Sequence, residues 1–518
     1  MKTYDSAASR SVPMALSELL EVARGLGLRG ELHGNPDTKV TDVVDDSRNV
    51  GRGSLFVALA GTRSDGASFL DQAAGAGASC WAGSSNPDAP SGLASIVVED
   101  SGQAAGLLAA AFCGVPTNSL DLVGITGTNG KTSTTYILES IWNAAATPCG
   151  VAGTIRQSGP GFSENAHLTT LPAVALQKLL ARMVRAGARA AAVEVSSHAL
   201  AQQRVAGCRF NVGVFTNLTR DHLDYHGDEQ SYFAAKARLF HRHLDSNHAA
   251  AVLNAEDERV AELATTLSGV DVWTFSTDPA VAARVRVLEA RTDLAGIRAR
   301  VELDGTPISI DSALIGMPNL SNILAAAAAA RALGIEPGAI EEGVRRCLPV
   351  PGRVERVGDG PPIVLVDYAH TPDALARVLA AIRGQVPGRL ICVFGCGGDR
   401  DRGKRSMMGA AAADAADLCV VTSDNPRSEA PGTIIAEIVA GMVNISTNIS
   451  DVAAPDARGF VIEVDRECAI RQAIAAAADD DVVVIAGKGH ETYQETGGRR
   501  SDFDDREIAL DALQVRQR

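Results

Sequence analysis

The stretch GITGTNGKTSTT has the residue types and order of a phosphate-binding loop. Gly127 and Gly130 permit a tight turn, and Lys131 and Thr132 follow at once, where they could neutralise phosphate oxygens and hold Mg²⁺. The general pattern would also require a glycine at Ile125, so the match is incomplete. The loop favours binding of ATP or GTP, and an ordinary glycine-rich turn is the alternative.

Acidic and polar residues follow two later apolar runs, where partners for this loop could lie. Glu194 ends the run ARAAAVEV, and the segment after FNVGVF contains Asn217, Asp221, His222 and Asp224. Mg²⁺ prefers oxygen ligands and keeps several waters, so a glutamate beside a loop threonine suits it chemically. Taken alone, His222 is more simply explained as a surface loop histidine.

These residues need parallel strands to bring them together. Apolar runs alternate with helix-like segments from LDLVGIT onward, which predicts a parallel sheet covered on both faces. After the Pro- and Gly-rich stretch LPVPGR the alternation restarts at PIVLVDYAH and predicts a doubly wound domain. Because ligands gather beyond the carboxyl ends of the strands in such sheets, the polar clusters should meet in one cleft.

We therefore expect an α/β protein of three domains. Residues 1–117 would form a small N-terminal α/β domain. Residues 118–350 would form a central P-loop-type parallel-sheet ATPase domain, and residues 351–518 a Rossmann-like domain. The polar stretch at 444–456 is interpreted as a surface insertion.

Composition narrows the class of protein. The 518 residues are 46% hydrophobic and 21% charged, with a formal net charge of −14, which indicates a folded enzyme without the basic face that nucleic acid requires. Nine cysteines without a CxxC pair indicate reduced thiols. Neither a signal-peptide core nor a bilayer-length apolar run is present. We expect a cytoplasmic monomer with no membrane insertion.

The motifs together resemble the Mur ligases of peptidoglycan synthesis. GTNGKT, EVSSH, TNLTRDHLDYH, YFAAKARLF, MPNLSNILAA and DYAHTP agree with that family in order and spacing. The motifs DDSR and GSLFVALAG near the start, and VFGCGGDRDRGKR, DNPR and GKGHE near the end, extend the resemblance to all three domains. They are most similar to the diaminopimelate-adding branch of the family.

The resemblance implies an ATP- and Mg²⁺-dependent amide ligase. It would join the D-Glu γ-carboxylate of UDP-MurNAc-L-Ala-D-Glu to meso-diaminopimelate through an acyl phosphate. The implied catalytic residues are Lys131, Glu194, His222 and Lys236, and the metal ligands would be Thr132, Glu194, His222 and Lys236 as a carbamate. Without the family, Lys236 would be interpreted as a solvated helical lysine.

The resemblance also implies three sets of binding residues. ATP would be bound by Gly127, Thr128, Asn129, Gly130, Lys131, Thr132, Ser133, Asn319, Asn322, Arg353 and Asp367. The UDP substrate would be bound by Ser47, Thr169, Thr170, Ser196, Gln202 and Arg204. Diaminopimelate would be bound by Arg400, Asp424, Asn425, Arg427, Gly487 and Glu491. Two positions depart from the family: Pro318 stands where many relatives have His or an aromatic residue, and Leu168 where relatives often have Asn.

The choice of amino acid depends on Arg427. Its planar guanidinium suits a carboxylate, and Glu491 offers a counter-charge for an ammonium group. Meso-diaminopimelate carries both groups at its far end, whereas lysine carries only the ammonium. Arg427 therefore favours diaminopimelate within this family. For Arg400, Asp424 and Asn425, a loop residue that caps a strand end is the alternative.

Two other functions stay open at this point. One is a related amide ligase, such as a lysine-adding Mur enzyme or a folylpolyglutamate synthetase, which would keep Lys131 and Glu194 but not DDSR and DNPR together. The other is a P-loop regulator that binds ATP and changes shape without ligase chemistry.

Overall fold

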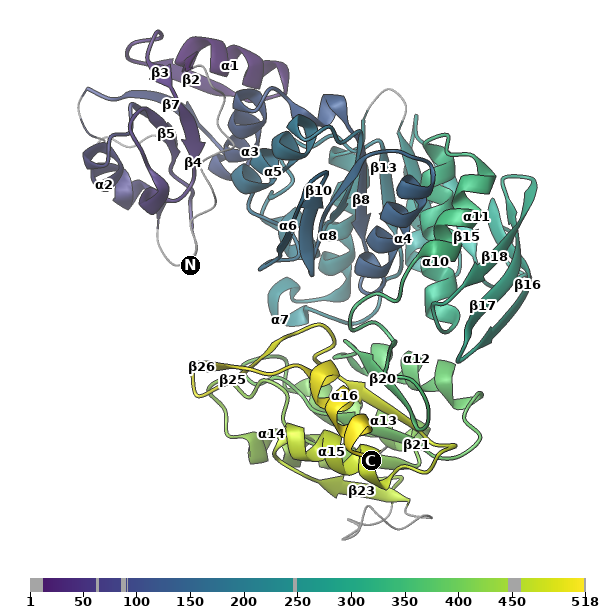
Figure 1. The fold of residues 1–518 in the computed structure, drawn as a ribbon. Helices are drawn as coiled ribbons and strands as arrows, with labels where there is room; N and C mark the ends of the chain where they lie inside the picture. Colours follow the sequence, from purple (N-terminus) through teal and green to yellow (C-terminus); the bar gives the residue numbers. More distant parts are fainter. Residues whose placement is uncertain are drawn as a thin grey trace.

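The computed structural model of the chain describes residues 13–61, 65–84, 90, 92–245, 249–445 and 458–516. These residues form three large sheets that follow one another along the chain, each with helices packed against it (Figure 1). Most of the polar stretch expected as an insertion, residues 446–456, lies outside the described residues.

The first sheet has five strands in the order β2-β7-β6-β5-β4, and only β2 runs antiparallel to its neighbour. Helices α1 and α3 cover one face, and α2 lies on the other. The strands are β1 Met14–Ala15, β2 Gly30–His33, β3 Lys39–Val40, β4 Asp42–Val44, β5 Ser54–Val57, β6 Cys80–Gly83 and β7 Ala94–Val98. The helices are α1 Leu16–Gly25, α2 Leu70–Gly75 and α3 Ser101–Phe112.

The second sheet has eleven strands in the order β11-β10-β9-β12-β8-β13-β14-β15-β16-β17-β18. Its strands are β8 Asp121–Thr126, β9 Cys149–Ala152, β10 Arg156–Gly159, β11 Phe162–Asn165, β12 Ala190–Glu194, β13 Val212–Phe215, β14 Ala250–Asn254, β15 Asp271–Ser276, β16 Val285–Asp293, β17 Gly296–Leu303 and β18 Thr306–Ser312. Its helices are α4 Lys131–Ala144, α5 Ala173–Arg185, α6 Ser197–Ala201, α7 Leu223–His226, α8 Glu229–Arg242, α9 Glu258–Ala264, α10 Met317–Ala332 and α11 Pro337–Arg346.

The second sheet is parallel at its centre, as predicted, and antiparallel strands that were not predicted extend it at both edges. Strands β9, β12, β8, β13, β14, β15 and β16 pair in parallel, but β10–β11 and β16–β17–β18 are antiparallel. Strands β17 and β18 alternate buried and exposed residues, as expected where one face of a strand meets water. The parallel centre is buried on both faces, by α4, α10 and α11 on one side and by α5, α8 and α9 on the other.

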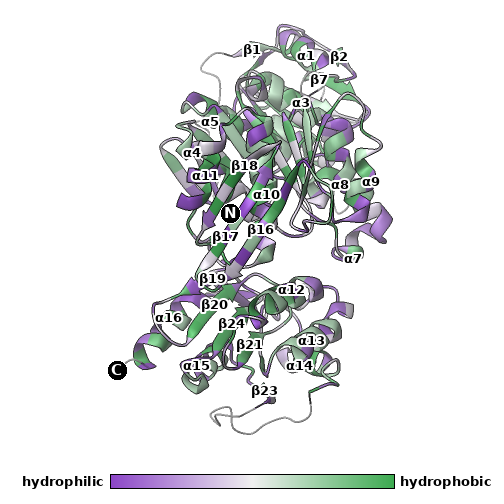
Figure 2. Ribbon diagram, turned by 90° about the vertical axis from the view of Figure 1, so that its right-hand side faces the viewer, coloured by the Kyte–Doolittle hydropathy of each residue, from purple (hydrophilic) through white to green (hydrophobic). Residues whose placement is uncertain are grey.

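The third sheet has six strands in the order β19-β20-β24-β21-β22-β23, all parallel except the edge strand β19. Its apolar strands lie between helix layers, α12–α14 on one face and α15–α16 on the other (Figure 2), so the doubly wound prediction is confirmed. The elements are β19 Glu355–Val357, β20 Ile363–Asp367, α12 Pro372–Arg383, β21 Leu390–Phe394, α13 Gly403–Ala415, β22 Leu418–Val421, α14 Pro431–Val439, β23 Gly459–Ile462, α15 Arg466–Ala476, β24 Val482–Ala486, β25 Tyr493–Thr496, β26 Arg499–Asp502 and α16 Asp505–Arg516.

The first sheet is held against the second through helix α3. A Cβ on Gly106 would lie 2.2 Å from the Ala206 carbonyl oxygen, so only glycine allows this approach. Across the same junction, the ammonium of Lys178 pairs with Asp42 at 2.7 Å.

The domain limits expected at 117/118 and 350/351 fall in the connections between the sheets, and they stay proposed limits. None of the described helices is both long and apolar enough to cross a membrane.

Candidate active site

The glycine loop joins the end of β8 to the start of α4, with Gly127 and Gly130 at φ +141° and +87°. A Cβ on Gly127 would lie 1.9 Å from the Thr216 hydroxyl oxygen, and one on Gly130 would lie 2.2 Å from Oδ1 of Asn322. Both glycines are therefore required by backbone conformation and by space. The second contact also places Asn322, a predicted adenine-side residue, against the loop.

The loop is held from the side by the segment after β13. Asn129 donates its backbone N–H to Oδ1 of Asn217 at 3.0 Å, and the Asn217 amide donates back to the Asn129 carbonyl at 3.2 Å. Thr216 donates to the same carbonyl at 2.5 Å. The TN pair that precedes LTRD in the sequence therefore fixes the shape of the loop, a role that sequence analysis did not give it.

Lys131 folds back over the loop. Its Nζ donates to the carbonyl oxygens of Gly127 at 2.8 Å and Thr128 at 2.9 Å. Burial lowers the pKa of this lysine. A lysine beside a glycine loop at the N-terminus of α4 is an arrangement of the kind that receives phosphate oxygens.

Glu194 ends β12, beside the strand that leads into the loop. Its side chain is 1% exposed and accepts hydrogen bonds from Thr132 Oγ1 at 3.0 Å, Thr154 Oγ1 at 2.8 Å and the Thr154 N–H at 2.9 Å. A carboxylate and two hydroxyls are hard oxygen donors, so this set fits Mg²⁺. Thr154 was not among the predicted residues, because a threonine between two strands carries no sequence signal.

Lys236 lies on α8 and is 1% exposed, so its interpretation as a solvated helical lysine was wrong. Its Nζ donates to the Gly127 carbonyl at 2.7 Å, the same oxygen that Lys131 contacts, and lies 4.5 Å from the centre of the Tyr232 ring. Burial, together with the charge of Lys131, holds the pKa of Lys236 well below its usual value. Both effects favour the neutral amine relative to the ammonium.

His222 follows β13 in a left-handed conformation, φ +54°, at the start of α7. Its Nε2 lies 3.3 Å from Oδ2 of Asp221, and its ring meets that of His198 at 4.7 Å. Burial lowers the pKa of His222 to about 4, with Asp221 acting in the opposite direction. The imidazole is neutral at physiological pH, as metal ligation requires.

The residues predicted for the muramoyl dipeptide form one hydrogen-bonded group next to Glu194. Thr170 donates to the Glu194 carbonyl at 2.7 Å, and Thr169 contacts Thr154 at 3.1 Å. Arg204 donates to the Thr170 carbonyl at 3.0 Å. The remaining links are Ser196 N–H to Thr170 Oγ1 and Arg204 Nη2 to Gln202 Oε1. Ser47 stands apart, on the first sheet, and donates to Gln72 at 3.2 Å.

The third sheet reaches the loop through Arg353. Its Nη2 donates to Thr132 Oγ1 at 3.3 Å, and its guanidinium lies 4.5 Å from the centre of the Tyr368 ring.

The third domain also affects Asp221, next to His222. Although burial raises the pKa of Asp221, the charges of His222, His370 and Lys404 hold it below the usual value. Helix α7 and the β16–β17 hairpin are parts of the central domain that face the third domain (Figures 1 and 2).

Five of the six predicted amino-acid residues lie beyond the carboxyl ends of β22 and β24, and Arg400 follows β21. Asn425 donates to Oε2 of Glu491 at 2.8 Å, and Arg427 donates to the Gly398 carbonyl at 2.7 Å. Gly487 adopts φ +116°, where a Cβ would lie 2.9 Å from Oδ2 of Asp424. Arg400 is exposed, so of the six predicted residues it is the one on the rim. Sequence analysis missed Lys488 between them.

Three residues of the predicted ATP-binding set form hydrogen bonds with neighbouring protein groups. Asp367 accepts hydrogen bonds from the N–H groups of Val354 and Ala369, both at 2.7 Å. Asn319 donates to the Ile315 carbonyl at 2.9 Å, and Asn322 donates to Oδ1 of Asn319 at 3.3 Å. Across the described residues, no group of three or more His, Cys, Asp and Glu side chains is arranged to hold a metal ion by itself.

Comparison with known proteins gives consistent results over the whole chain. A family profile described as "Mur ligase middle domain" matches residues 125–330, and one described as "Mur ligase, glutamate ligase domain" matches residues 352–489. A relative from Gloeobacter violaceus, named UDP-N-acetylmuramoyl-L-alanyl-D-glutamate--2,6-diaminopimelate ligase, is 46% identical over 508 residues. This alignment covers 97% of this chain and 99% of the relative.

Solved structures of similar proteins have the same architecture. The structure of a UDP-N-acetylmuramoyl-L-alanyl-D-glutamate--2,6-diaminopimelate ligase matches with a TM-score of 0.70 at 31% identity, covering 98% of this chain and 100% of that one. A MurF ligase from Thermotoga maritima, in complex with ADP, matches with a TM-score of 0.61 over 92% of this chain and 97% of that one. Its 19% identity supports a likeness of fold alone.

The loop geometry predicts the effect of a single methyl group. Gly130→Ala adds a Cβ that meets Asn322, and we expect the dissociation constant for ATP to rise at least tenfold in calorimetric titration. Gly161→Ala is the matched control, because Gly161 has a similar φ of +79° but open space around it. Both variants should lose about 1–2 kcal/mol from the left-handed backbone. Equal ATP affinity in the two variants would contradict the assigned loop.

Proposed function

The chain belongs to the Mur ligase family, and from this premise we propose that it joins meso-diaminopimelate to the γ-carboxylate of D-Glu in UDP-MurNAc-L-Ala-D-Glu. The energy would come from cleavage of ATP to ADP and phosphate, with the phosphoryl group passing through the substrate carboxylate. The observation that carries this proposal is the likeness, over nearly the full length of both chains, to a relative named for that activity. We further propose that the protein acts as a cytoplasmic monomer in the synthesis of peptidoglycan precursors.

The loop supports the first half of the reaction. A carboxylate is a poor electrophile, so one of its oxygens must first attack the γ-phosphorus of ATP, with release of ADP and formation of an acyl phosphate. Little covalent help is needed, but the transferring group must be positioned and its charge neutralised. Lys131 and the loop amides are arranged for this, beside the predicted dipeptide residues that would hold the attacking carboxylate.

Mg²⁺ would be held by Thr132 and Glu194, and when bound it would neutralise phosphate charge. The oxygen donors of these residues already lie 3.0 Å apart in a buried position. His222, as a neutral imidazole, would orient or complete the metal shell. Arg353, which contacts Thr132 from the third domain, would bring a fixed positive charge to the same phosphates.

Lys236 would contribute as a carbamate. A neutral amine attacks CO₂ to form an N–C bond and releases one proton, whereas an ammonium cannot react. Burial and the neighbouring Lys131 favour the neutral amine. The product would place an anionic oxygen ligand near the Gly127 carbonyl in place of the amine, which would suit a divalent cation nearby.

The second half of the reaction needs the amino acid held by its far end. Its free amine attacks the acyl carbon, the C–O bond breaks, and phosphate leaves with the oxygen that came from the carboxylate. Arg427 has no hydrogen-bond partner at Nη2 or Nε among the described residues, and neither has Oε1 of Glu491. These groups are free to bind a carboxylate and an ammonium, which the far end of diaminopimelate carries together.

Two departures from the family have local explanations. Pro318 lies in the first turn of α10, where a missing N–H costs nothing, so the helix that carries Asn319 and Asn322 begins normally. Leu168 is 43% exposed, immediately before Thr169. We propose that it contacts the substrate through its apolar surface in place of a polar group.

The proposed reaction is tested by phosphate release from ATP with UDP-MurNAc-L-Ala-D-Glu present. We expect release with meso-diaminopimelate, and little with L-lysine or without an amino acid. A preference for lysine would keep the ligase but favour the lysine-adding alternative. Release that ignores both the amino acid and the muramoyl nucleotide would favour a P-loop regulator without ligase chemistry.

Arg427→Ala should raise the KM for diaminopimelate at least tenfold and leave the KM for ATP near normal. Loss of a carboxylate contact by a planar guanidinium costs more than about 1.4 kcal/mol, which is a factor of ten. Steady-state kinetics measure both constants. Arg345→Ala is the matched control, since Arg345 pairs with Glu342 on an exposed helix face. Unchanged diaminopimelate kinetics would remove Arg427 from the site.

The carbamate is tested with ¹³C-labelled bicarbonate and NMR. The native protein should show a carbamate carbon signal near neutral pH, and Lys236→Gln should not. Lys39→Gln, which changes an exposed lysine of the first domain, should keep the signal. A native protein without the signal, or a Lys236→Gln variant that retains it, would disprove carbamate formation at this lysine.

A further inference from the structure

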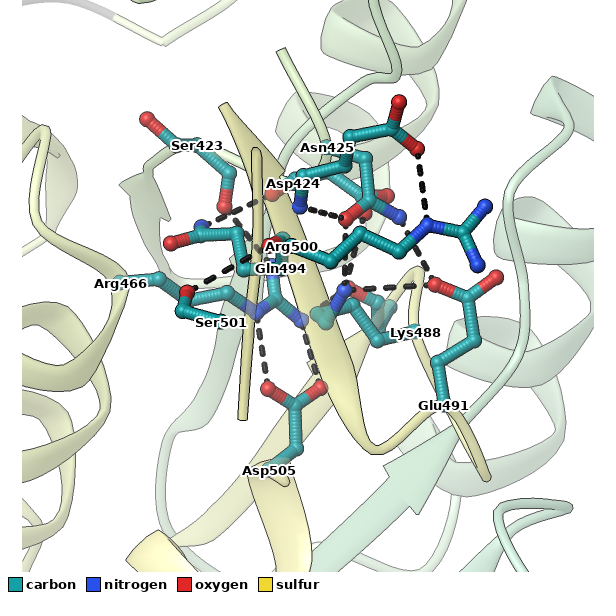
Figure 3. A network of polar contacts seen from close by, with 12 residues as sticks. Ser423, Asp424, Asn425, Arg466, Lys488, Glu491, Gln494, Arg500, Ser501 and Asp505 are labelled. Carbon is teal, nitrogen blue, oxygen red and sulfur yellow. Dashed lines mark hydrogen bonds and ion pairs between the residues drawn. The ribbon is translucent and has the colours of Figure 1, made fainter. Parts of the chain in front are cut away.

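Lys488 is fully buried, at 0% exposure, among the residues proposed to bind the amino acid: Asp424, Asn425, Arg427 and Glu491. We call this group of residues the acceptor pocket. Its Nζ donates to Oδ1 of Asn425 at 3.1 Å and to Oε2 of Glu491 at 3.3 Å. Asp424 lies on another side, with Oδ1 at 3.8 Å from the same nitrogen. Figure 3 shows the ammonium between these side chains, so three of the proposed amino-acid ligands converge on it.

The strand ends around Lys488 are held by a different cation. Arg466, on α15, pairs with Asp505 at 2.7 and 2.8 Å and donates to the carbonyls of Ser423 at 3.3 Å and Ala486 at 3.0 Å (Figure 3). These carbonyls lie where β22 and β24 end. Because Arg466 supports the backbone there, Lys488 is not required for that purpose, and its contacts are with side chains alone.

The charges in the pocket balance. Asp424 and Glu491 carry two negative charges, and Lys488 and Arg427 carry two positive ones. Buried charges are costly unless they are paired, so two neighbouring carboxylates without Lys488 would be strongly unfavourable. A neutral pocket suits the far end of diaminopimelate, which carries one ammonium and one carboxylate.

We propose that Lys488 is a positioning residue of the acceptor pocket, whose ammonium balances Asp424 and Glu491 and fixes the Asn425 amide to receive the zwitterionic end of the amino acid. This inference rests on the proposed function. Lys488 acts through its neighbours, because its own nitrogen is surrounded by protein groups.

The contacts of Asn425 show how the positioning works. Its Oδ1 accepts hydrogen bonds from Lys488 at 3.1 Å and from the Glu495 N–H at 2.9 Å, so its Nδ2 must point to Oε2 of Glu491. Glu491 therefore has one oxygen held by two donors, while Oε1 stays free among the described residues. Removing the ammonium would take one hydrogen bond from each side chain and leave the Glu495 N–H as the only remaining donor to Oδ1 of Asn425 among the described residues.

The same contacts set the protonation of Glu491. Burial and Asp424 raise the pKa of its carboxyl, whereas Lys488 and Asn425 lower it. Tyr368, Tyr493 and Arg466 also face this carboxyl from neighbouring elements. Glu491 must be ionised to bind an ammonium. Without Lys488 its pKa rises further, so binding would fail at a higher pH than in the native protein.

The test uses Lys488→Met, which keeps the length of the side chain and removes its charge. We expect the KM for diaminopimelate to rise at least tenfold, with the KM for ATP unchanged. The acid limb of kcat/KM for diaminopimelate should move upward by about one pH unit or more, as expected when an opposite charge is lost. Lys39→Met, an exposed lysine far from the pocket in sequence, is the matched control.

A second variant, Lys488→Met with Asp424→Asn, separates charge balance from packing. It removes one charge of each sign, so the acid limb should return toward the native position even though diaminopimelate binds weakly. The proposal would be overturned if the acid limb of the kcat/KM profile did not move in Lys488→Met, or if the single and double variants had the same acid limb. Failure of both variants to fold would also overturn it. Failure of the native chain to use diaminopimelate would instead overturn the proposed function.

Discussion

Two lysine side chains share one backbone carbonyl, that of Gly127, and the active site depends on this contact. Lys131 reaches it from the start of α4 and Lys236 from α8, at 2.8 and 2.7 Å. Two ammonium groups at one oxygen repel each other in a buried place, so this contact favours the neutral form of one amine. Lys236 is the more deeply buried of the two, which is why the proposed carbamate is assigned to it.

The rest of the site extends outward from that carbonyl. Glu194 and Thr132 place hard oxygens on one side, and the dipeptide group continues from Glu194 through Thr170. Arg353 closes the other side from the third domain, where the acceptor pocket lies at the ends of β22 and β24. In the proposed reaction each domain contributes only part of the chemistry. That reaction would therefore depend on how the sheets are joined as well as on the side chains of the site.

The sequence predicted the parts of this arrangement that have local signals. The glycine loop, the buried parallel strands and the doubly wound third domain follow from periodicity and turn residues. The hairpin strands β16–β18 were missed because their two-residue alternation is short and rich in charge. The burial of Lys236 and Lys488 could not be predicted either. Both follow from tertiary contacts between segments far apart in the chain, and a lysine in a helix or loop gives no local sign of them.

The central claim is that the γ-phosphoryl group of ATP is placed on the substrate carboxylate before the amine attacks. It is tested most directly with UDP-MurNAc-L-Ala-D-Glu that carries ¹⁸O at both oxygens of the D-Glu γ-carboxylate. The released phosphate is then analysed by mass spectrometry. The account predicts that one ¹⁸O appears in each phosphate formed with diaminopimelate. Phosphate free of ¹⁸O, with normal formation of the amide, would contradict it.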